Sequence, residues 1–397
     1  MREISFFMAN KILFIWPQEP FLPQGLFKHF VFLGETAEYA KRFGEVKIYD
    51  LSVRPEKRKT ILAEAKKSDY IFIPIEAYNV IDAINLSKTL RKNGDAKIIS
   101  YGSVPSVNPF VLSPYFDYVL KNGHWQIAIK ELILDKEKFE KSLINKNIYD
   151  KKCSFESHEW CFPALDLLPM EEYSKIHPNQ LEFSVQRGCV FNCPFCNEKS
   201  KVPEARTYQR DPSEIVEFLK KNKGYYYYFD ATTFTQNREW VRELCKLIKP
   251  LKIKWRTVTR IDQIDEEFGK ILSEAGCDKI GFGVESFLLE RQKEFKKVMT
   301  PKIVREKSDI LIKNGIVPRA FFILGLPNQT KEEILETQEQ IEKLGIEYRW
   351  KEYISFEKVK EANTIEDFKI FERSNFPKHK IPGVSFELYN KLSSIER

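Results

Sequence analysis

Short apolar runs alternate with amphipathic stretches along most of the 397 residues, and this alternation restricts the fold more than any other feature of the sequence. In the first part, apolar runs lie at residues 11–16, 45–49, 70–74, 96–101 and 118–120, with helical patterns at 26–43, 61–67, 79–92 and from 126 onward. Strands that alternate with helices pair in parallel through crossover connections. The pattern predicts an α/β fold that begins with a Rossmann-like, doubly wound parallel sheet over residues 1–140, which binds ligands at the carboxyl ends of its strands.

A second alternation follows residues 141–180, a stretch without periodicity that is predicted to be a linker. Apolar runs lie at residues 181–185, 225–229, 253–258, 279–284, 320–324 and 350–355, with helical patterns at 212–221, 238–248, 266–275, 300–314 and 331–343. Six successive β/α units predict a partial (β/α)6 TIM barrel over residues 181–355, with catalytic residues at the carboxyl ends of the strands. Residues 356–397 are predicted to form a small C-terminal cap over the barrel mouth.

Three cysteines, Cys189, Cys193 and Cys196, follow the first predicted barrel strand with Cys-x3-Cys-x2-Cys spacing. Thiolates hold iron–sulfur clusters, and three ligands leave one iron of a four-iron cluster open to a group other than protein. A structural zinc site is the alternative, and it needs a fourth ligand. The candidates close in sequence are Cys153, Cys161, His158 and His177. Disulfides are disfavoured because the seven cysteines are an odd number and no secretory segment is recognised, which favours a cytoplasmic location.

Composition and charge limit the kinds of partner that the chain is expected to bind. The chain is 43% hydrophobic and 14% aromatic, which is typical of a globular protein and excludes a disordered one. The net charge of +7 arises from 64 basic and 57 acidic residues that are scattered along the chain, so nucleic acid is an unlikely partner. The apolar run at residues 11–16 is too short to span a membrane, and no membrane association is expected.

The order of the motifs resembles that of radical S-adenosylmethionine (SAM) enzymes with an N-terminal cobalamin-binding domain, the class B methyltransferase-like group. Besides the cysteine motif, Gly281-Phe282-Gly283-Val284-Glu285-Ser286 resembles the fourth-strand segment of this family, and Gly325-Leu326-Pro327 resembles the turn after the fifth strand. The resemblance is close over residues 181–330 and looser elsewhere. It implies that the three cysteines ligate a [4Fe–4S] cluster and that the amine and carboxylate of SAM chelate the open iron, where reductive cleavage yields a 5′-deoxyadenosyl radical.

The same resemblance implies which residues contact SAM. Asp230 would accept a hydrogen bond from the SAM ammonium, Arg260 would make a two-pronged contact with the SAM carboxylate, and Glu285 would bind the ribose hydroxyls. Phe195 would shield the cluster beside the adenine. The other residues expected at SAM are Asn197, Thr232 and Ser286. A core phenylalanine, a surface arginine and a solvated glutamate are the structural alternatives for Phe195, Arg260 and Glu285.

The first domain resembles the cobalamin domain through fewer residues. The run that begins Tyr101-Gly102-Ser103 falls where the family usually has Gly-Gly, so Tyr101 takes the place of one glycine. Gly102 and Ser103 are expected at the cofactor, as are Asn122 and Gly123, which stand in a reduced form of a later Gly-Glu-Gly-Glu stretch. Tyr78 is expected to line the lower face of the cofactor. The sequence has no Asp-x-His-x-x-Gly segment, so no histidine of the usual type would ligate cobalt. The alternative is a relic domain that packs on the barrel and binds nothing.

Three functional hypotheses follow from these features. The first is a C-methyltransferase that acts on an unactivated carbon of a small-molecule or natural-product precursor through the 5′-deoxyadenosyl radical and methylcobalamin, with an electron donor such as flavodoxin or ferredoxin as partner. The second is a cobalamin-independent radical SAM cyclase, epimerase or rearrangement enzyme with a vestigial cobalamin domain. The third is a non-catalytic iron–sulfur or zinc protein, and it leaves the joint occurrence of Asp230, Arg260 and Glu285 unexplained. A methylthiotransferase acting on transfer RNA fits poorly, since residues 1–150 contain no cysteine for a second cluster.

Overall fold

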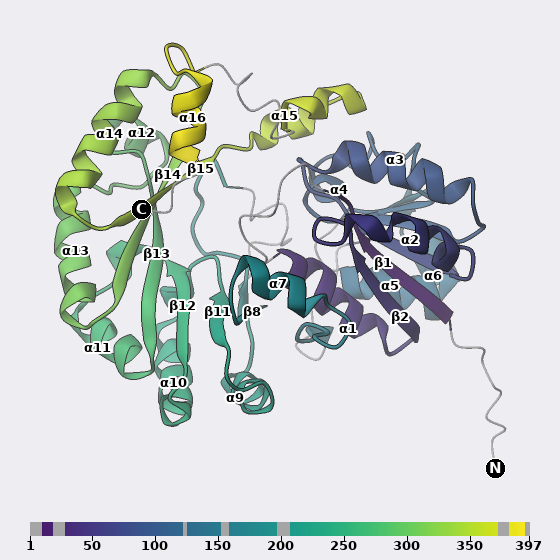
Figure 1. Cartoon of the computed structure of the whole chain (residues 1–397), viewed down its shortest axis with the longest axis horizontal. Helices are drawn as coiled ribbons and strands as arrows, with labels where there is room; N and C mark the ends of the chain where they lie inside the picture. Colours follow the sequence, from purple (N-terminus) through teal and green to yellow (C-terminus); the bar gives the residue numbers. More distant parts are fainter. Residues whose placement is uncertain are drawn as a thin grey trace. The chain divides into compact units, whose positions relative to one another are not determined.

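The computed structural model describes residues 10–18, 28–121, 125–151, 159–196, 207–371 and 381–393, and the chain folds into two compact units. Met1–Pro178 and Phe356–Arg373 belong to the first unit, whereas Asn179–Lys199, Glu204–Ser355 and Ser374–Arg397 belong to the second. Each unit combines a sheet of mainly parallel strands with helices that cover it (Figure 1). The predicted α/β class is confirmed.

The sheet of the first unit has seven strands in the order β2-β1-β3-β4-β5-β7-β6. The strands are β1 (Asn10–Trp16), β2 (Gly44–Asp50), β3 (Tyr70–Pro74), β4 (Lys97–Tyr101), β5 (Tyr118–Leu120), β6 (Leu143–Ile144) and β7 (Ile148–Tyr149). All pair in parallel except β6, which runs antiparallel to β7. The strand order reverses between β1 and β3, and doubly wound sheets bind ligands at the carboxyl ends beside such a reversal. The predicted Rossmann-like sheet is therefore confirmed.

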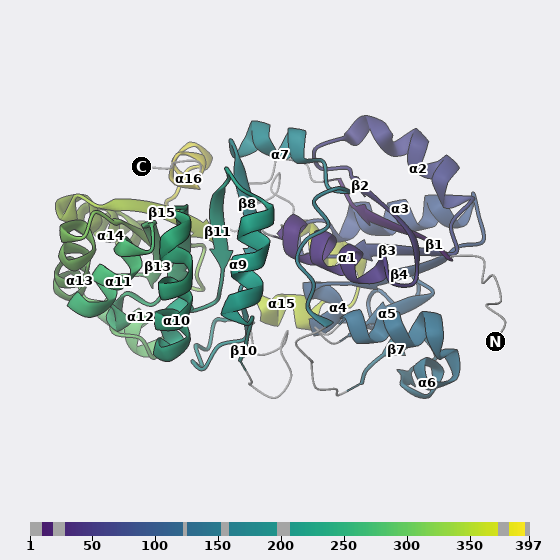
Figure 2. The ribbon, with the colours of Figure 1, turned by 90° about the horizontal axis from the view of Figure 1, so that it is seen from below.

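Helices cover both faces of this sheet. They are η1 (a π-helix, His29–Glu35), α1 (Thr36–Ala40), η2 (Pro55–Lys57), α2 (Arg58–Ala65), α3 (Val80–Arg91), α4 (Ser103–Val107), α5 (Trp125–Leu134), α6 (Lys136–Lys141) and α7 (Met170–Ile176). Helices α3 and α5 lie on opposite sides of the sheet (Figure 2). On the α5 side, Phe14 stacks on Phe72 with ring centroids 5.0 Å apart, and Tyr101 meets Trp125 edge to face at 5.0 Å.

Strands β6 and β7 and helix α7 lie within residues 141–180, which the sequence predicts to be a linker. Each of these strands has only two residues, which is too short for an alternating pattern to be recognised. Strand β7 nevertheless extends the sheet beyond β5. In the described part of the first predicted helix, a π-helical segment precedes α1 in place of one continuous α-helix.

The second unit is a partial barrel of six parallel strands in the order β15-β14-β13-β12-β11-β8. The strands are β8 (Gln180–Ser184), β11 (Tyr226–Asp230), β12 (Lys254–Thr259), β13 (Cys277–Glu285), β14 (Val317–Leu324) and β15 (Glu347–Glu352). The helices are α9 (Pro212–Lys221), η5 (Phe234–Gln236), α10 (Arg238–Ile248), η6 (Lys249–Leu251), η7 (Ile261–Gln263), α11 (Glu266–Glu274), α12 (Leu289–Glu294), α13 (Pro301–Lys313) and α14 (Lys331–Leu344). The strand order follows the sequence, and helices α10, α11, α13 and α14 lie along the outer side of the sheet (Figure 1). The predicted partial barrel is confirmed.

Side-chain caps explain why the barrel helices begin where they do. The side chains of Asp211, Asn237, Asp265, Thr300 and Thr330 each accept a hydrogen bond from a backbone N–H in the first turn of α9, α10, α11, α13 and α14. These N–H groups have no partner within the helix, so a cap stabilises it by about 1 kcal/mol. Helices α10, α11 and α14 begin seven or eight residues after the ends of β11, β12 and β14, whereas longer segments that include the cysteine motif and α12 follow β8 and β13.

The two faces of the barrel sheet differ in chemistry because side chains alternate along each strand. The outer face is aromatic, with Phe229 stacked on Trp255 at 4.7 Å and packed against Phe183. The inner face carries polar groups, and the Arg256 guanidinium lies 4.5 Å from the centre of the Tyr228 ring. Aromatic burial against the helices stabilises the sheet and leaves the inner face for ligands.

The C-terminal residues, which the sequence predicts to form one cap over the barrel, are divided between the two units. Helices α15 (Phe356–Glu361) and η8 (Ile365–Phe371) belong to the first unit, and α16 (Phe386–Ser393) lies in the second, where it contacts β15. The Asn108 side-chain amide donates hydrogen bonds to the carbonyls of Val359 and Ala362 at 2.9 and 2.8 Å. This amide holds the end of α15 in the first unit, which no pattern in the sequence indicates. Within the described residues, no helix has the length and apolarity needed to cross a membrane.

Candidate active site

The cysteine loop begins at the carboxyl end of the first barrel strand. Strand β8 leads into β9 (Gln186–Arg187), which pairs antiparallel with β10 (Tyr208–Gln209), and Gly188 then turns the chain with φ of 78°. A positive φ of this size favours glycine, because a side chain there would be strained. Cys189 and Cys193 are half-buried and Cys196 is exposed.

The segment after β11 holds the cysteine loop in place. Thr232 donates its hydroxyl hydrogen bond to the carbonyl of Gly188, and the Thr233 hydroxyl lies 3.5 Å from the Cys189 sulfur. The side-chain carbonyl of Gln236 accepts a hydrogen bond from the backbone N–H of Val190 at 3.0 Å. Thr232, which the resemblance places at SAM, is thus engaged with the backbone of the cysteine loop, and Gln236 is a support that sequence reasoning missed.

The basic residues that influence Cys193 lie in the segments after β12 and α12. Burial raises the pKa of the Cys193 thiol, and the charges of Lys297 and Arg260 act in the opposite direction. Within the described residues, no three His, Cys, Asp or Glu side chains already converge on one point, so ligation by the three cysteines stays a prediction. The donor set nevertheless fits an iron–sulfur cluster, because three thiols lie on one loop beside two cations that favour the thiolate form.

Arg260 lies over the cysteine loop at the end of the third barrel strand. Its guanidinium is 4.2 Å from the centre of the Phe191 ring, and its Nε donates to a carboxylate oxygen of Asp262 at 3.1 Å. A guanidinium stacked on an aromatic ring keeps a fixed orientation. The predicted place of Arg260 beside the cysteines is therefore seen, and its contact with a SAM carboxylate stays a prediction.

Phe195 joins the cysteine loop to the far side of the barrel. Its ring meets Phe295 edge to face at 4.8 Å, and it packs on a small apolar cluster that includes Ile323 and Leu326. Leu326 belongs to the predicted Gly325-Leu326-Pro327 turn, so the cysteine loop and the end of the fifth strand meet in space. Asn197, also expected at SAM, lies outside the described residues.

Glu285 ends β13 in an unusual backbone conformation with φ of 71°. One of its carboxylate oxygens accepts a hydrogen bond from the Lys297 ammonium at 3.0 Å. The neighbouring Ser286 is buried, and its hydroxyl lies 3.0 Å from a carboxylate oxygen of Glu333. The structure therefore engages Ser286 within the fold, and it brings Lys297, a residue that sequence reasoning missed, to the predicted ribose-binding glutamate.

Asp230 lies at the carboxyl end of β11, directly beside Ser184 in the register of β8. Since the strands are parallel, Asp230, Arg260 and Glu285 end three strands at the same edge of the sheet as the cysteine loop. This placement agrees with the prediction that they share one site, although their individual contacts with SAM stay predictions.

A second polar group lies in the first unit, at the carboxyl ends of β3 and β4. The Glu76 carboxylate accepts a hydrogen bond from the Ser103 backbone N–H at 3.1 Å, and its ion pair with Lys28 places that ammonium 5.1 Å from the centre of the Tyr78 ring. The Asn79 side chain accepts from the Glu76 backbone N–H at 2.9 Å. The Asn79 amide nitrogen and the Ser103 hydroxyl are buried and have no hydrogen-bond partner in the described structure. Buried polar atoms are rarely left unpaired, so this group is suited to a polar ligand.

Tyr101 does not obstruct this edge, although it replaces a glycine of the family pattern. Its side chain is fully buried in the core and donates a hydrogen bond to the Phe32 carbonyl at 2.8 Å. The following Gly102 has φ of 116°, and a Cβ there would lie 2.8 Å from the Ile75 carbonyl oxygen. Asn122 and Gly123, the other residues expected at cobalamin, lie outside the described residues.

Replacing Gly102 with valine is expected to destabilise the first unit by about 2–4 kcal/mol, because a branched side chain would meet both a strained φ and the backbone of Ile75. Urea unfolding followed by hydrogen exchange of β3 and β4 measures the effect. Gly224 also has positive φ, but no atom lies within 4 Å of its Cβ position. The matched change there should therefore cost only the free energy of the strained φ. Equal losses at both positions would contradict the close approach of Gly102 to Ile75.

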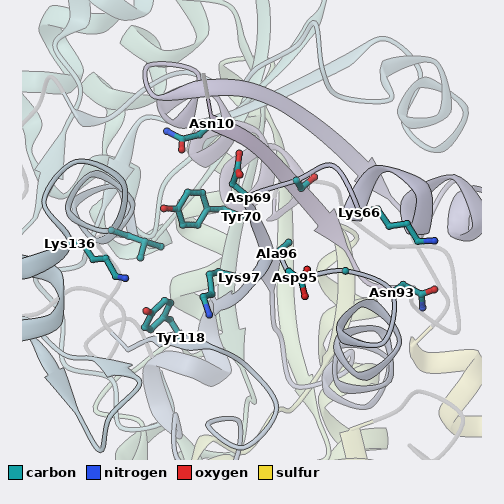
Figure 3. A pocket seen from close by; sticks show the side chains of 13 residues that line it. Asn10, Lys66, Asp69, Tyr70, Asn93, Asp95, Ala96, Lys97, Tyr118 and Lys136 are labelled. Atoms are coloured by element: carbon teal, nitrogen blue, oxygen red, sulfur yellow. The ribbon is translucent and has the colours of Figure 1, made fainter. Parts of the chain in front are cut away.

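A cavity of about 560 Å³ lies at the opposite edge of the first sheet. Asn10, Tyr70, Lys97 and Tyr118 line it from the beginnings of four strands (Figure 3). Ligands of doubly wound sheets bind at the carboxyl ends, not at these amino ends. The cavity is therefore separate from the polar group around Glu76.

The family model described as the radical SAM superfamily matches residues 183–341. The chain is a radical SAM enzyme. The matched residues begin in β8, include the cysteine loop and end in α14, so they cover nearly the whole barrel. The family implies a [4Fe–4S] cluster and SAM as cofactors, which agrees with the thiols and charged groups at the carboxyl edge of this barrel.

Two curated relatives match different shares of the chain. An uncharacterised methyltransferase of Pyrococcus horikoshii is 26% identical over 344 residues, which cover 80% of this chain and 73% of that protein. An anaerobic magnesium-protoporphyrin IX monomethyl ester cyclase of Cereibacter sphaeroides is 31% identical over 165 residues, which cover 39% of this chain and only 26% of that protein. The similarity to the methyltransferase thus extends through both units, and that to the cyclase covers less than half of the chain.

Solved structures show the same fold across both units. The radical SAM methyltransferase TsrM from Kitasatospora setae, with cobalamin and a [4Fe–4S] cluster bound, matches with a TM-score of 0.67 and 16% identity over 87% of this chain and 72% of that chain. The cobalamin-dependent radical SAM enzyme OxsB, with aqua-cobalamin and SAM bound, matches with a TM-score of 0.63 and 16% identity over 98% of this chain and 58% of that chain. At this identity the matches establish the fold, which is that of cobalamin-dependent radical SAM methyltransferases.

Proposed function

We propose that this radical SAM enzyme binds cobalamin and methylates an unactivated carbon of a small-molecule substrate. The observation that carries the proposal is the polar group around Glu76, with its buried and unpartnered Asn79 nitrogen and Ser103 hydroxyl. It lies at the carboxyl edge of a sheet whose fold matches two cobalamin-binding proteins. The carboxamide side chains of a corrin can accept hydrogen bonds from both unpartnered groups.

The carboxyl edge of the first sheet is compact at Gly102. Its missing side chain lets the backbone after β4 pack directly against Ile75 at the end of β3, next to the unpartnered Ser103 hydroxyl. Tyr78 lies beside the Lys28 ammonium next to this edge, as expected for a residue that lines one face of the cofactor. The inward direction of Tyr101 removes the main steric objection to binding.

In the second unit, the residues of the active site bind and orient. Cys189, Cys193 and Cys196 would hold the cluster, while Asp230, Arg260 and Glu285 would hold the amino acid and ribose parts of SAM. When bound, these cofactors supply a hydrogen-abstracting radical, and cobalamin supplies the methyl group. An electron donor such as flavodoxin or ferredoxin is required, because reductive cleavage of SAM consumes one electron from the cluster.

The alternative is radical SAM chemistry without cobalamin, such as a cyclisation. It is favoured by the 31% identity to a cyclase, which exceeds the 26% identity to the methyltransferase. The higher identity covers only 39% of this chain, whereas the similarity to the methyltransferase covers 80% of it.

Anaerobic reconstitution separates the two functions. The protein is loaded with iron and sulfide, offered hydroxocobalamin and desalted, and the iron, cobalt and absorption spectrum are measured. About one cobalt per chain with a base-off spectrum supports the methyltransferase, and methylated product should then accompany S-adenosylhomocysteine and 5′-deoxyadenosine. Iron near four per chain without cobalt would overturn it in favour of cobalamin-independent chemistry. Zinc without iron would contradict the radical SAM assignment itself.

Replacing Ser103 with alanine gives a sharper test of the proposed cobalamin edge. The hydroxyl has no partner in the protein, so its loss should leave the free energy of unfolding of the apo-protein unchanged within about 0.5 kcal/mol. Cobalamin should bind about 2–10-fold more weakly, the value of one hydrogen bond. Asn85→Ala on the exposed side of α3 is the control. Unchanged cobalamin affinity in Ser103→Ala would argue against this residue as a ligand.

A further inference from the structure

Lys297 is the least expected charged residue at the active site. It lies between α12 and α13, in a segment of alternating charged and apolar residues that gives no functional signal. Its side chain is nevertheless only 7% exposed, and that of its partner Glu285 is 11% exposed. Burying two charges together is seldom the most stabilising use of a core position, and hydrophobic residues of similar volume often do as well. Stability alone therefore does not explain why Lys297 and Glu285 are buried together.

The backbone around the pair is built to hold it. Glu285 has φ of 71°, and its carboxylate folds back over Gly283, where a Cβ would lie 2.1 Å from the carboxylate oxygen. Only glycine leaves room for the carboxylate in this position. A residue whose strained backbone conformation is held in place by its neighbours is typical of ligand-binding sites.

Gln292 fixes the segment that carries Lys297. Its side-chain amide donates to the carbonyls of Ser286 and Met299 at 2.9 and 2.8 Å, and its side-chain carbonyl accepts from the Met299 backbone N–H at 2.9 Å. The residues on both sides of the ion pair are thus tied to one buried side chain. Lys297 has little freedom to leave Glu285.

We propose that Lys297 is a positioning residue of the radical SAM site, whose ammonium fixes the Glu285 carboxylate for SAM. The inference rests on the radical SAM assignment and is independent of cobalamin. Fixing the carboxylate lowers the cost of ordering it when SAM binds.

The test compares Lys297→Met and Lys297→Arg with the wild type, all reconstituted with iron and sulfide and without cobalamin. Equilibrium dialysis gives the Kd for SAM, and the iron content shows whether the cluster is assembled. Lys297→Met is expected to weaken SAM binding at least about tenfold. Lys297→Arg keeps the charge and should return the Kd towards wild type. Lys293→Met, an exposed change on α12, is the matched control.

The possible results distinguish a failure of the role proposed for Lys297 from a failure of the radical SAM assignment. A wild-type protein that binds neither iron nor SAM would overturn the radical SAM assignment. A wild type that binds both, with Lys297→Met equal to it in SAM affinity, would overturn only the role of Lys297. If Lys297→Met fails to assemble a cluster, Lys297→Arg decides, because a charge-based role requires it to regain iron and SAM binding and its failure to do so would overturn the proposal.

A double-mutant cycle with Glu285→Gln tests how Lys297 acts on SAM. If the lysine acts by holding the glutamate, Lys297→Met should weaken SAM binding much less in the Glu285→Gln background than in the wild type. Fully additive effects would contradict the positioning role.

Discussion

Replacing Cys193 with alanine is expected to remove most of the bound iron and to reduce SAM cleavage to below about 1% of wild type. Cys193 is one of the two half-buried cysteines of the motif, and the resemblance to radical SAM enzymes predicts it to be a cluster ligand. Two remaining cysteines cannot complete a site that already leaves one iron to SAM. Iron content and the 5′-deoxyadenosine formed after reduction with dithionite measure the two effects.

Cys161→Ala provides the matched control for this change. Cys161 is also half-buried, and its sulfur lies 3.5 Å from an Arg42 nitrogen in the first unit, away from the cysteine motif in sequence and in fold. The control should keep wild-type iron and SAM cleavage. A Cys193→Ala protein that retained about four irons per chain and cleaved SAM would exclude Cys193 as a ligand.

The barrel and the position of its active site could be predicted because parallel strands place their ends at one edge. The cysteine motif follows β8, Asp230 ends β11 and Glu285 ends β13, so reading the strand ends in order already assembles the site. The same argument identified the doubly wound sheet. These predictions depend on element order, which hydrophobic periodicity reports well in long strands.

The partners of the active-site residues could not be predicted, because they depend on side-chain directions that sequence patterns do not contain. Lys297 reaches Glu285 only because Glu285 has positive φ and Gly283 leaves space. Thr232 and Ser286 were expected at SAM from motif position, yet their hydroxyls contact Gly188 and Glu333. A motif specifies the backbone position of a residue better than the direction of its side chain.

Tyr101 shows the same limit in the first unit. From the sequence it is a bulky substitution for a glycine beside a flat cofactor, but the pleat of β4 turns its ring into the core between Phe14 and Trp125. The close backbone contact lies instead at the adjacent Gly102, which packs against the backbone of Ile75. Tyr101 is therefore a smaller obstacle to cobalamin binding than the sequence suggests.

Replacing Asp50 with alanine is expected to destabilise the first unit by about 3–5 kcal/mol, because it breaks a buried ion pair. One Asp50 carboxylate oxygen lies 2.7 Å from His29 Nδ1 and accepts the Tyr173 hydroxyl at 2.6 Å. The other accepts from the Ser52 backbone N–H at 2.9 Å. Asp50 ends β2, so this network fixes the carboxyl edge of the sheet. Urea unfolding monitored by hydrogen exchange of β1 and β2 measures the loss, and β12 and β13 report on the other unit.

The stability contributed by Asp50 should depend on pH. Burial alone would raise the pKa of Asp50, but His29 and the hydrogen bonds from Ser52 and Tyr173 outweigh it and hold the pKa below its usual value. A carboxyl group whose pKa is lower in the folded chain stabilises it fully above the unfolded value of about 3.9, and loses this effect as the pH falls through the folded value. The difference in unfolding free energy between wild type and Asp50→Ala should therefore shrink as the pH falls below about 4. Asp95→Ala, an exposed change in the same unit, should alter neither the stability nor its pH dependence, and a similar loss there would contradict the special role of the buried network.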